Sequence, residues 1–262
     1  MLDEKICLVT GSGSGIGRAS ALEMARQRAV VAVSDVNDAA GIETVAQIRQ
    51  IGGSAEYFHC DVEDSAQIAA LVAQVVEHFG GLDVLHNNAG IQESFYTADL
   101  TVDTLPEAVW EKVCNVNLRA VWLATRFAAP HLRRSTRGPA IVNTGSTGAF
   151  NAYPGCPVYS ATKAAVQALT KTTALDLAPD VRCNCIAPGG IDTEMVDRWR
   201  QAATDKEAVD RMIVSTHLMP RLAKPAEVAK LVCFLASDDA SWINGSTHLI
   251  DGGSLAWRGS NG

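Results

Sequence analysis

Residues 10–17 read Thr10-Gly11-Ser12-Gly13-Ser14-Gly15-Ile16-Gly17, and they join a short apolar run to a segment of helical period. Glycines at such a junction allow a tight turn and let backbone N–H groups and a helix N-terminus approach a bound phosphate. The stretch misses the strict dinucleotide fingerprint G-x-G-x-x-G, because Ile16 and Arg18 occupy the two possible positions of its last glycine. By itself it fits a pyrophosphate-binding turn, or a turn that only lets a helix pack closely on a strand.

On both sides of this turn, short β-branched runs alternate with longer segments of helical period. Strands are expected at residues 6–9, 30–34, 84–86, 140–143, 181–187 and near 248–250, and helices at 16–27, 42–51, 66–78, 110–128, 158–177 and 225–235. Continuous apolar strands joined by helices indicate a parallel sheet that is covered on both faces. We therefore expect an α/β fold, with one doubly wound, Rossmann-type domain over residues 1–262 and right-handed crossovers. Residues 190–218 interrupt the alternation and are expected to form a lid over a site.

Composition excludes several classes of protein. The chain has 262 residues, 47% hydrophobic and 19% charged, which is typical of a globular protein and not of a disordered or fibrous one. Its 22 basic and 29 acidic residues give a formal net charge of −7, so we expect no binding of nucleic acid or anionic lipid. No run approaches the about 18 uninterrupted apolar residues that span a bilayer, and Asp3 and Glu4 lie where a signal peptide is positively charged. We expect a soluble, cytoplasmic protein without a membrane partner.

The cysteines and histidines indicate no metal site. The seven cysteines are scattered and never spaced as C-x-x-C, which favours buried thiols over a disulfide framework or a zinc knuckle. The six histidines form no i, i+4 pair and no H-E-x-x-H motif. We therefore expect the protein to hold no metal ion.

Asp35 ends the second expected strand, roughly 20 residues after the glycines. A carboxylate at this position accepts hydrogen bonds from the adenosine ribose hydroxyls and repels a ribose 2′-phosphate. Val36 follows it and Ser14 lies in the turn, so no basic residue is placed to offset that repulsion. We expect the cofactor to be NAD(H) and not NADP(H), unless Asp35 is only a turn residue before Asn37.

Tyr159 and Lys163 are four residues apart in the expected helix 158–177, so they share one helix face. A phenol with its ordinary pKa of about 10 is a poor base at neutral pH, but a nearby ammonium group and the positive nicotinamide ring would lower that pKa. Tyr159 is then a candidate general acid and base. The alternative is that the two side chains only snorkel from the rim of a helix.

Together with further motifs, these segments resemble the short-chain dehydrogenase/reductase family, in its shorter, cofactor-first branch, over nearly the whole chain. The matching motifs follow the family's order: Thr10-Gly11-x-x-x-Gly15-Ile16-Gly17, Cys60-Asp61-Val62, Asn87-Asn88-Ala89-Gly90, Asn117, Ser146, Tyr159-x-x-x-Lys163 and Pro188-Gly189-Gly190-Ile191-Asp192-Thr193. The resemblance implies an oxidoreductase that transfers a hydride between a nicotinamide cofactor and an alcohol or ketone. Two departures are visible: Gly145 replaces a frequent serine beside Ser146, and residues 92–106 are longer than usual, which is expected to remodel the rim of the substrate pocket.

The resemblance also implies catalytic roles for Asn117, Ser146, Tyr159 and Lys163. Tyr159 would exchange a proton with the substrate oxygen, and Ser146 would hydrogen-bond the same oxygen. Lys163 would lower the pKa of Tyr159 and hold the nicotinamide ribose, while Asn117 would help to hold a relay water. Cofactor contacts are implied for Gly11, Ser14, Gly15, Ile16, Gly17, Asp35, Asp61, Val62, Asn88, Ala89, Gly90, Tyr159, Lys163, Pro188, Gly189, Ile191 and Thr193.

The residues expected to reach the substrate are mostly apolar or aromatic, with a few hydroxyl groups. They are Gln92, Ser94, Phe95, Tyr96, Ser146, Thr147, Phe150, Tyr153, Cys156, Tyr159, Met195, Val196 and Trp199. No Arg or Lys cluster is among them, which favours a neutral secondary alcohol and its ketone, cyclic or steroid-like, over a phosphorylated substrate.

Two of the expected helices, 110–128 and 158–177, carry apolar residues on more than one face, including Trp122 and Val166. Family members that the chain resembles pair subunits through these helices. We therefore expect a homo-oligomer, either a tetramer or a dimer.

Two other functions remain open from the sequence. A methyltransferase that binds S-adenosylmethionine would use Gly11, Gly13, Gly15 and Asp35. It would give no role to Tyr159, Lys163 or Ser146. An NADH-binding sensor without catalysis would use the same glycine turn, since dinucleotide folds also host non-enzymes. A sensor, however, has no need of a proton relay.

Overall fold

A seven-stranded parallel sheet forms the centre of the computed structural model, which describes residues 1–257. Its strand order is β3-β2-β1-β4-β5-β6-β7. The strands are β1 (Ile6–Thr10), β2 (Val30–Asp35), β3 (Ser54–His59), β4 (Val84–Asn87), β5 (Ala140–Thr144), β6 (Arg182–Pro188) and β7 (Thr247–Ile250). The α-helices are α1 (Gly15–Arg26), α2 (Asp38–Gln50), α3 (Ser65–Phe79), α4 (Glu107–Cys114), α5 (Ala120–Leu132), α6 (Pro157–Leu177), α7 (Glu194–Ala202), α8 (Lys206–Val214) and α9 (Pro225–Ala236). The short helical segments are η1 (Glu93–Phe95), η2 (Asn115–Arg119), η3 (Thr147–Ala149) and η4 (Asp238–Ala240).

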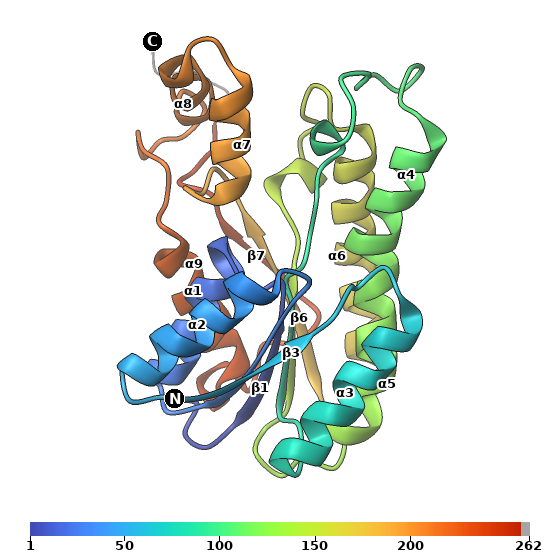
Figure 1. Cartoon of the computed structure of the whole chain (residues 1–262), viewed down its shortest axis with the longest axis vertical. Helices are drawn as coiled ribbons and strands as arrows, with labels where there is room; N and C mark the ends of the chain where they lie inside the picture. The colour runs from blue at the N-terminus through green and yellow to red at the C-terminus, as the bar shows by residue number, and fades with distance from the viewer. Residues whose placement is uncertain (258–262) are drawn as a thin grey trace.

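Helices cover both faces of the sheet (Figure 1). One layer contains α1, α2 and α9, and the other contains α3, α5 and α6. Side chains along the strands alternate between the two layers: Val9 and Val33 pack with α1 and α9, while Leu8 and Leu85 pack with α3 and α5. Because both faces are buried, the central strands are continuous apolar runs. The expected doubly wound α/β fold is confirmed.

The chain changes its direction of travel across the sheet between β1 and β4. Leu8 in β1 lies beside Ala32 in β2 on one side and beside Leu85 in β4 on the other. After β1 the chain builds outward to β3, and it then returns to β4 and builds outward to β7. In open parallel sheets, ligands bind in the crevice that this reversal leaves at the carboxyl ends of the strands. The glycine turn follows β1, so it lies at this crevice.

Two elements differ from the sequence prediction. The sequence did not predict the strand β3. This strand lies at the edge of the sheet, and only Ala55 among its residues is buried, so its sequence contains no continuous apolar run. The expected helix 110–128 is divided, because a π-helical turn over Asn115–Arg119 separates α4 from α5. Such turns often occur at functional sites, and this one carries Asn117.

The expected lid, residues 190–218, contains the two helices α7 and α8, drawn in orange in Figure 1. In the helical layer that contains α3, α5 and α6, Trp122 on α5 is 46% exposed, but Val166 on α6 is fully buried. Val166 packs with Val121 and Cys185 inside the protein, so it does not lie on an outward face of α6 and gives no support to the expected subunit pairing. Within residues 1–257, none of the helices is both long and apolar enough to cross a membrane.

Candidate active site

A cavity of about 930 Å³ runs from the glycine turn after β1 to the lid. Most of the predicted site residues line it: Gly11, Ser14, Gly15, Ile16, Asp35, Asp61, Val62, Asn88, Ala89, Gly90, Ser146, Tyr153, Tyr159, Lys163, Pro188, Gly189, Ile191, Thr193 and Met195. Gly17, Asn117 and Phe150 are not among its lining residues. One cavity therefore brings together the residues predicted for cofactor binding and those predicted for catalysis.

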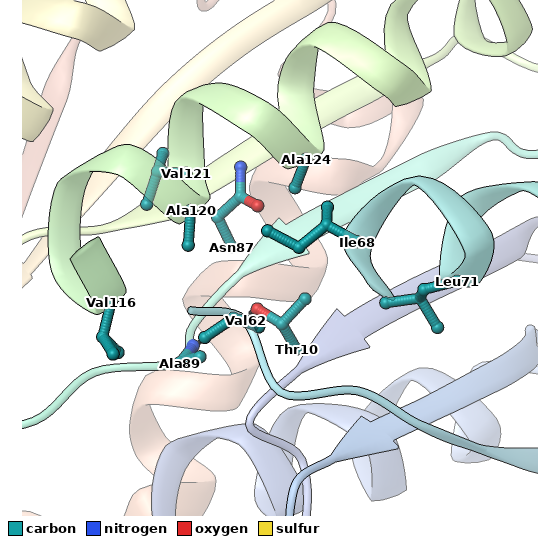
Figure 2. A pocket seen from close by; sticks show the side chains of 10 residues that line it. All are labelled: Thr10, Val62, Ile68, Leu71, Asn87, Ala89, Val116, Ala120, Val121 and Ala124. Atoms are coloured by element: carbon teal, nitrogen blue, oxygen red, sulfur yellow. Dashed lines mark hydrogen bonds between the residues drawn. The ribbon is translucent and has the colours of Figure 1, made fainter. Parts of the chain in front are cut away.

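A much smaller pocket adjoins this cavity (Figure 2). Val62, Ala89 and Val116 line both, and the rest of the small pocket is mostly apolar, with Ile68 pointing into it. Its volume is about 10 Å³. One water molecule needs about 10–15 Å³, so the pocket is a gap in the core and not a second ligand site.

The glycines of the turn meet two different requirements. Gly11 has φ +63° and Gly15 has φ +50°, in the left-handed region that side chains disfavour. A Cβ atom at Gly17 would lie 2.1 Å from the carbonyl oxygen of Gly11, so glycine is needed there for α1 to approach the turn. The side chain of Ser14 does not cap α1. The N–H groups of the first helical turn are therefore available to an anion such as a pyrophosphate.

Asn88 ties the end of β4 to the glycine turn. Its Nδ2 donates to the carbonyl oxygens of Thr10 and Gly11, both at 3.0 Å. In return, Thr10 Oγ1 accepts from the N–H groups of Asn88 at 3.1 Å and Ala89 at 3.2 Å. These bonds hold the ends of β1 and β4 together across the floor of the cavity.

Asp35 ends β2, and backbone N–H groups hold its carboxylate in place. Oδ2 accepts from Gly13 at 2.8 Å, and Oδ1 accepts from Asn37 at 2.9 Å. A Cβ atom at Gly13 would lie 2.8 Å from Oδ2, so the glycine permits the first of these bonds. The neighbouring Val36 is 59% exposed, and Arg18 donates to the Gly13 carbonyl oxygen without lining the cavity. This part of the wall carries the Asp35 carboxylate, which forms no ion pair with a Lys or Arg within residues 1–257.

Tyr159 and Lys163 lie one turn apart on α6 and are 8% and 4% exposed. Lys163 Nζ lies 5.7 Å from the centre of the Tyr159 ring and donates to the carbonyl oxygen of Thr144 at 2.8 Å. The side chains of Ser146 and Gln92 lie close enough to the Tyr159 phenol to lower its pKa. A phenol, a hydroxyl, an amide and an ammonium group therefore meet at one part of the cavity wall.

Burial dominates the protonation of this pair. It raises the pKa of Tyr159 to about 12, and the side chains of Ser146 and Gln92 offset only part of that rise. Burial also lowers the pKa of Lys163 to about 8. The predicted lowering of the Tyr159 pKa by Lys163 is thus not met in this structure, because removal from water disfavours the charged form of each group.

Asn117 acts beside the cavity and not on its wall. Its Oδ1 accepts from the N–H of Ile91 at 2.9 Å, and its Nδ2 donates to the carbonyl oxygen of Ile91 at 2.9 Å and to Thr162 Oγ1 at 3.3 Å. Gly90 lies between Asn117 and Lys163, since a Cβ atom there would be 3.6 Å from Asn117 Oδ1 and 3.4 Å from Lys163 Nζ. The amide thus fixes the segment that separates it from the lysine.

The segment from Pro188 to Thr193 leads from β6 into the lid and crosses the glycine turn. A Cβ atom at Gly15 would lie 3.2 Å from Thr193 Cγ2. The same segment also passes close to Asp251, which follows β7. A Cβ atom at Gly189 would lie 2.9 Å from the Cα atom of Asp251, so glycine is needed at this second close approach. The cofactor residues predicted on the two segments therefore face one another.

An ion-pair cluster holds the lid together. Arg200 on α7 donates to Asp192 at 2.8 Å and to Asp197 at 2.7 Å. Its Nε donates to Asp210 on α8 at 2.9 Å. Hydrogen bonds to these carboxylates raise the pKa of Arg200, which stays charged. Arg200 thus joins the two lid helices and the segment before them.

The lid also contacts η1 across the cavity. Trp199 Nε1 donates to Ser94 Oγ at 3.4 Å. The guanidinium carbon of Arg198 lies 4.5 Å from the centre of the Phe95 ring. This second contact keeps Phe95 beneath the lid and outside the cavity lining, where a substrate contact was predicted.

The substrate end differs in part from the prediction. Thr147 Oγ1 is hydrogen-bonded to the Tyr153 hydroxyl and donates to the carbonyl oxygen of Pro188 at 3.2 Å, so it supports the wall without lining it. Phe150 is 49% exposed outside the cavity. The sequence carries no motif for several residues that do line it: Ile91, Leu100, Pro154, Gly155, Met212, Ile213, Thr216, His217 and Ser254. Across residues 1–257, no group of three or more His, Cys, Asp or Glu side chains is placed to hold a metal ion.

Comparison with known proteins gives a consistent result. The family model described as "Enoyl-(Acyl carrier protein) reductase" matches residues 11–254. A cyclopentanol dehydrogenase from Comamonas sp. (strain NCIMB 9872) is 37% identical over 97% of this chain and 98% of its own. A cyclohexanol dehydrogenase from Acinetobacter sp. (strain SE19) is 36% identical over 95% of this chain and 94% of its own. The ligand-free structure of Thermoplasma acidophilum aldohexose dehydrogenase superposes with a TM-score of 0.88 at 33% identity, and the match covers 98% of this chain and 96% of that one.

Proposed function

The chain belongs to the short-chain dehydrogenase/reductase family, and on that premise we propose that it is an NAD(H)-dependent oxidoreductase of secondary alcohols and ketones. The observation that carries this proposal is the single cavity lined by Asp35, the glycine turn, Ser146, Tyr159 and Lys163. Dehydrogenases of this family use nicotinamide cofactors. The preference for NAD(H) is our inference from Asp35.

The residues present fit a dinucleotide. The uncapped start of α1 and the left-handed Gly11 and Gly15 form a cradle for a pyrophosphate. Each oxygen of Asp35 accepts one backbone N–H, and a carboxylate oxygen can accept a further bond from a ribose hydroxyl. Within residues 1–257, Lys163 Nζ makes a hydrogen bond only to Thr144, which leaves N–H groups for the nicotinamide ribose.

We assign the proton chemistry to Tyr159. A bound NAD⁺ would supply the acceptor for the hydride that leaves the alcohol carbon. As the C–O bond becomes a carbonyl, the hydroxyl proton passes to Tyr159, which can act as the base where a positive charge such as a bound nicotinamide ring would offset the burial that raises its pKa. The Ser146 hydroxyl donates a hydrogen bond to the same oxygen. Reduction uses the same groups in reverse. Lys163 and the Asn117 segment, separated only by Gly90, support a relay of the proton to solvent.

The substrate we propose is a neutral secondary alcohol, with cyclic alcohols foremost. The substrate end of the cavity is formed largely by apolar side chains such as Leu100, Pro154, Met195 and Ile213. An apolar wall with few polar groups suits a compact carbocycle better than a phosphorylated substrate. Cyclopentanol and cyclohexanol dehydrogenases are among the relatives, which supports this choice.

The two competing functions explain less of the site. A methyltransferase would use the glycine turn and Asp35 but has no task for the buried Tyr159 and Lys163. A sensor would bind NADH without needing the Ser146 and Tyr159 pair. Burying a lysine and a phenol disfavours their charged forms, so their burial costs free energy. A role in proton transfer explains why both are buried in the site, whereas nucleotide binding alone does not.

The test is turnover of NAD⁺, followed by nicotinamide absorbance, with cyclic alcohols, acyclic diols, aldohexoses and hydroxysteroids. The matched variant is Tyr159→Phe, which keeps the ring and removes the hydroxyl. We expect wild-type turnover to fall at least about 100-fold in the variant, since acid–base groups contribute about 10² to 10⁴. NADH affinity, measured by fluorescence titration, should stay within twofold. Turnover retained by Tyr159→Phe would remove Tyr159 from this role, and tight S-adenosylmethionine binding would favour the methyltransferase.

A further inference from the structure

A buried carboxylate holds the start of the helix that carries Tyr159. Glu93, in η1, is 0% exposed. Its Oε1 accepts from the backbone N–H groups of Val158 at 3.0 Å and Tyr159 at 3.2 Å, and 65 residues separate Glu93 from the first of them. The backbone of the proposed acid–base residue is therefore fixed from a distant segment.

The start of α6 lacks the usual local partners. Cys156, which precedes the helix, makes no side-chain cap, and Pro157 has no N–H group to donate. The next N–H groups are those of Val158 and Tyr159, and they would be unsatisfied without Glu93. A carboxylate at a helix N-terminus makes charge-assisted bonds that the helix dipole favours. Glu93 thus supplies a cap that the local sequence does not.

The residues beside Glu93 reach the same cavity. Gln92 is 2% exposed, lines the cavity beside Tyr159 and lowers the pKa of its phenol, while Ser94 accepts from Trp199 of the lid at 3.4 Å. Three consecutive residues of this segment therefore contact the phenol, the backbone of Tyr159 and the lid. Any shift of η1 would move all three contacts together.

Capping alone does not account for the second oxygen of Glu93. Oε2 is buried and has no hydrogen-bond partner among the residues that the structure describes. The charge of Glu93 also contributes, after burial, to raising the pKa of Cys156 to about 12, so the carboxylate acts on the cavity wall that Cys156 forms. A buried carboxylate with one unsatisfied oxygen costs free energy, and such costs often mark functional sites.

We propose that Glu93 is a positioning residue for the reaction, which holds Tyr159 at the height on α6 where its phenol meets Ser146 and Gln92. This inference rests on the proposed function. Displacing a reacting group by about 1 Å can cost about 100-fold in rate, so the anchor matters more for turnover than for binding. The contacts of Glu93 are to the backbone of α6, and it does not line the cavity.

The experiment compares Glu93→Gln and Glu93→Ala with wild type. Gln keeps an acceptor oxygen for the two N–H groups but loses the charge, and Ala loses both. A matched control is Glu227→Gln, because Glu227 accepts from the Lys224 N–H at 2.8 Å at the start of α9 and does not line the cavity. Each protein is measured for kcat, for KM of the best alcohol, for NADH affinity and for thermal stability.

We expect kcat to fall about 10-fold in Glu93→Gln and about 100-fold in Glu93→Ala, with KM and NADH affinity within twofold of wild type. Glu227→Gln should lower stability and leave kcat unchanged. A purely structural cap would instead lower the melting temperature of the Glu93 variants and leave kcat intact, and that result would overturn the inference. If Glu93→Ala does not fold, wild-type kcat in Glu93→Gln overturns it equally. A wild-type protein that oxidises no alcohol would refute the proposed function, whereas active Glu93 variants would refute only this inference.

Discussion

The ammonium group of Lys163 lies 5.7 Å from the centre of the Tyr159 ring, one turn further along the same face of α6. Both side chains are buried, and burial lowers the pKa of Lys163 from 10.5 to about 8. Between these two values the unfolded chain binds more protons than the folded one. Folding stability attributable to Lys163 therefore rises as the pH rises from about 8 to 10.5.

This sign predicts the behaviour of Lys163→Met, in which a neutral chain of similar length replaces the lysine. The wild type should gain unfolding free energy relative to the variant as the pH rises from 7.5 to 10. The full difference between the pKa values of Lys163 in the unfolded and the folded protein corresponds to about 3 kcal/mol, at about 1.4 kcal/mol per pKa unit. Urea unfolding of both proteins at several pH values measures the difference, in which the contributions of all other titrating groups cancel. A difference that does not change with pH would mean that Lys163 keeps its ordinary pKa in the folded protein.

Cofactor choice should depend on Asp35 and its neighbour Val36. In the wild type we expect NADH to bind at least about 10-fold more tightly than NADPH, which is about 1.4 kcal/mol of discrimination against the 2′-phosphate. The double variant Asp35→Ala with Val36→Arg should reverse this order, because it removes the repelling carboxylate and adds a phosphate partner. Fluorescence titration with both nucleotides measures the change. The single variant Val36→Arg, which keeps Asp35, should gain less, and tighter NADPH binding by the wild type would contradict the assignment.

Lid closure should depend on Arg200. Arg200→Ala removes the bonds of this side chain to Asp192 before α7, to Asp197 on α7 and to Asp210 on α8, so the lid should become mobile. We expect KM for the alcohol to rise about 10-fold, with a smaller change in NADH affinity. Steady-state kinetics and nucleotide titration separate the two effects.

The matched control for the lid is Arg211→Ala. Arg211 pairs with Asp205 and Glu207 at the start of its own helix, so its loss leaves α7 and α8 joined. Its KM should remain within twofold of wild type. Equal changes in both variants would mean that surface charge, and not the link between the lid helices, sets substrate binding.

Subunit pairing should involve the outer faces of α5 and α6. Trp122 is 46% exposed and Leu175 is 77% exposed, although both are large apolar residues. We expect light scattering to give the mass of a dimer or tetramer, and Trp122→Glu with Leu175→Glu to lower that mass at least twofold, since buried unpaired charges are costly. Ile42→Glu, at a 57% exposed position on α2, is the control and should leave the mass unchanged. A monomeric wild type would refute the expectation.

Local patterns predicted most of the fold. Apolar runs such as Ile6 to Val9 and the helical period before and after them are visible in the sequence because both sheet faces are buried. The edge strand β3 could not be found in this way, since only Ala55 within it is buried. Val166 was counted among the apolar residues that favour subunit pairing, but it is buried inside the protein. An apolar residue on a helix does not by itself reveal whether it faces the protein interior or another subunit.

Part of the cavity was also outside the reach of the sequence. Leu100, Met212 and Ser254 line it, but each comes from a segment without a motif. Phe95 and Phe150 were expected there, and the structure places both outside the cavity lining. Their positions depend on how the lid and η1 meet, as in the contact of Arg198 with the Phe95 ring.

The sequence by itself determined the features that depend on neighbouring residues: the left-handed glycines of the turn, the acidic end of β2 at Asp35, and the spacing that puts Tyr159 and Lys163 on one helix face. These follow from steric limits on φ and from helical periodicity, which act over a few residues. Tertiary structure alone decided that Glu93 caps α6 across 65 residues and that burial shifts the pKa values of Tyr159 and Lys163. Hydrogen bonding across such distances and exclusion of water depend on how whole elements pack, and no short stretch of sequence encodes that packing.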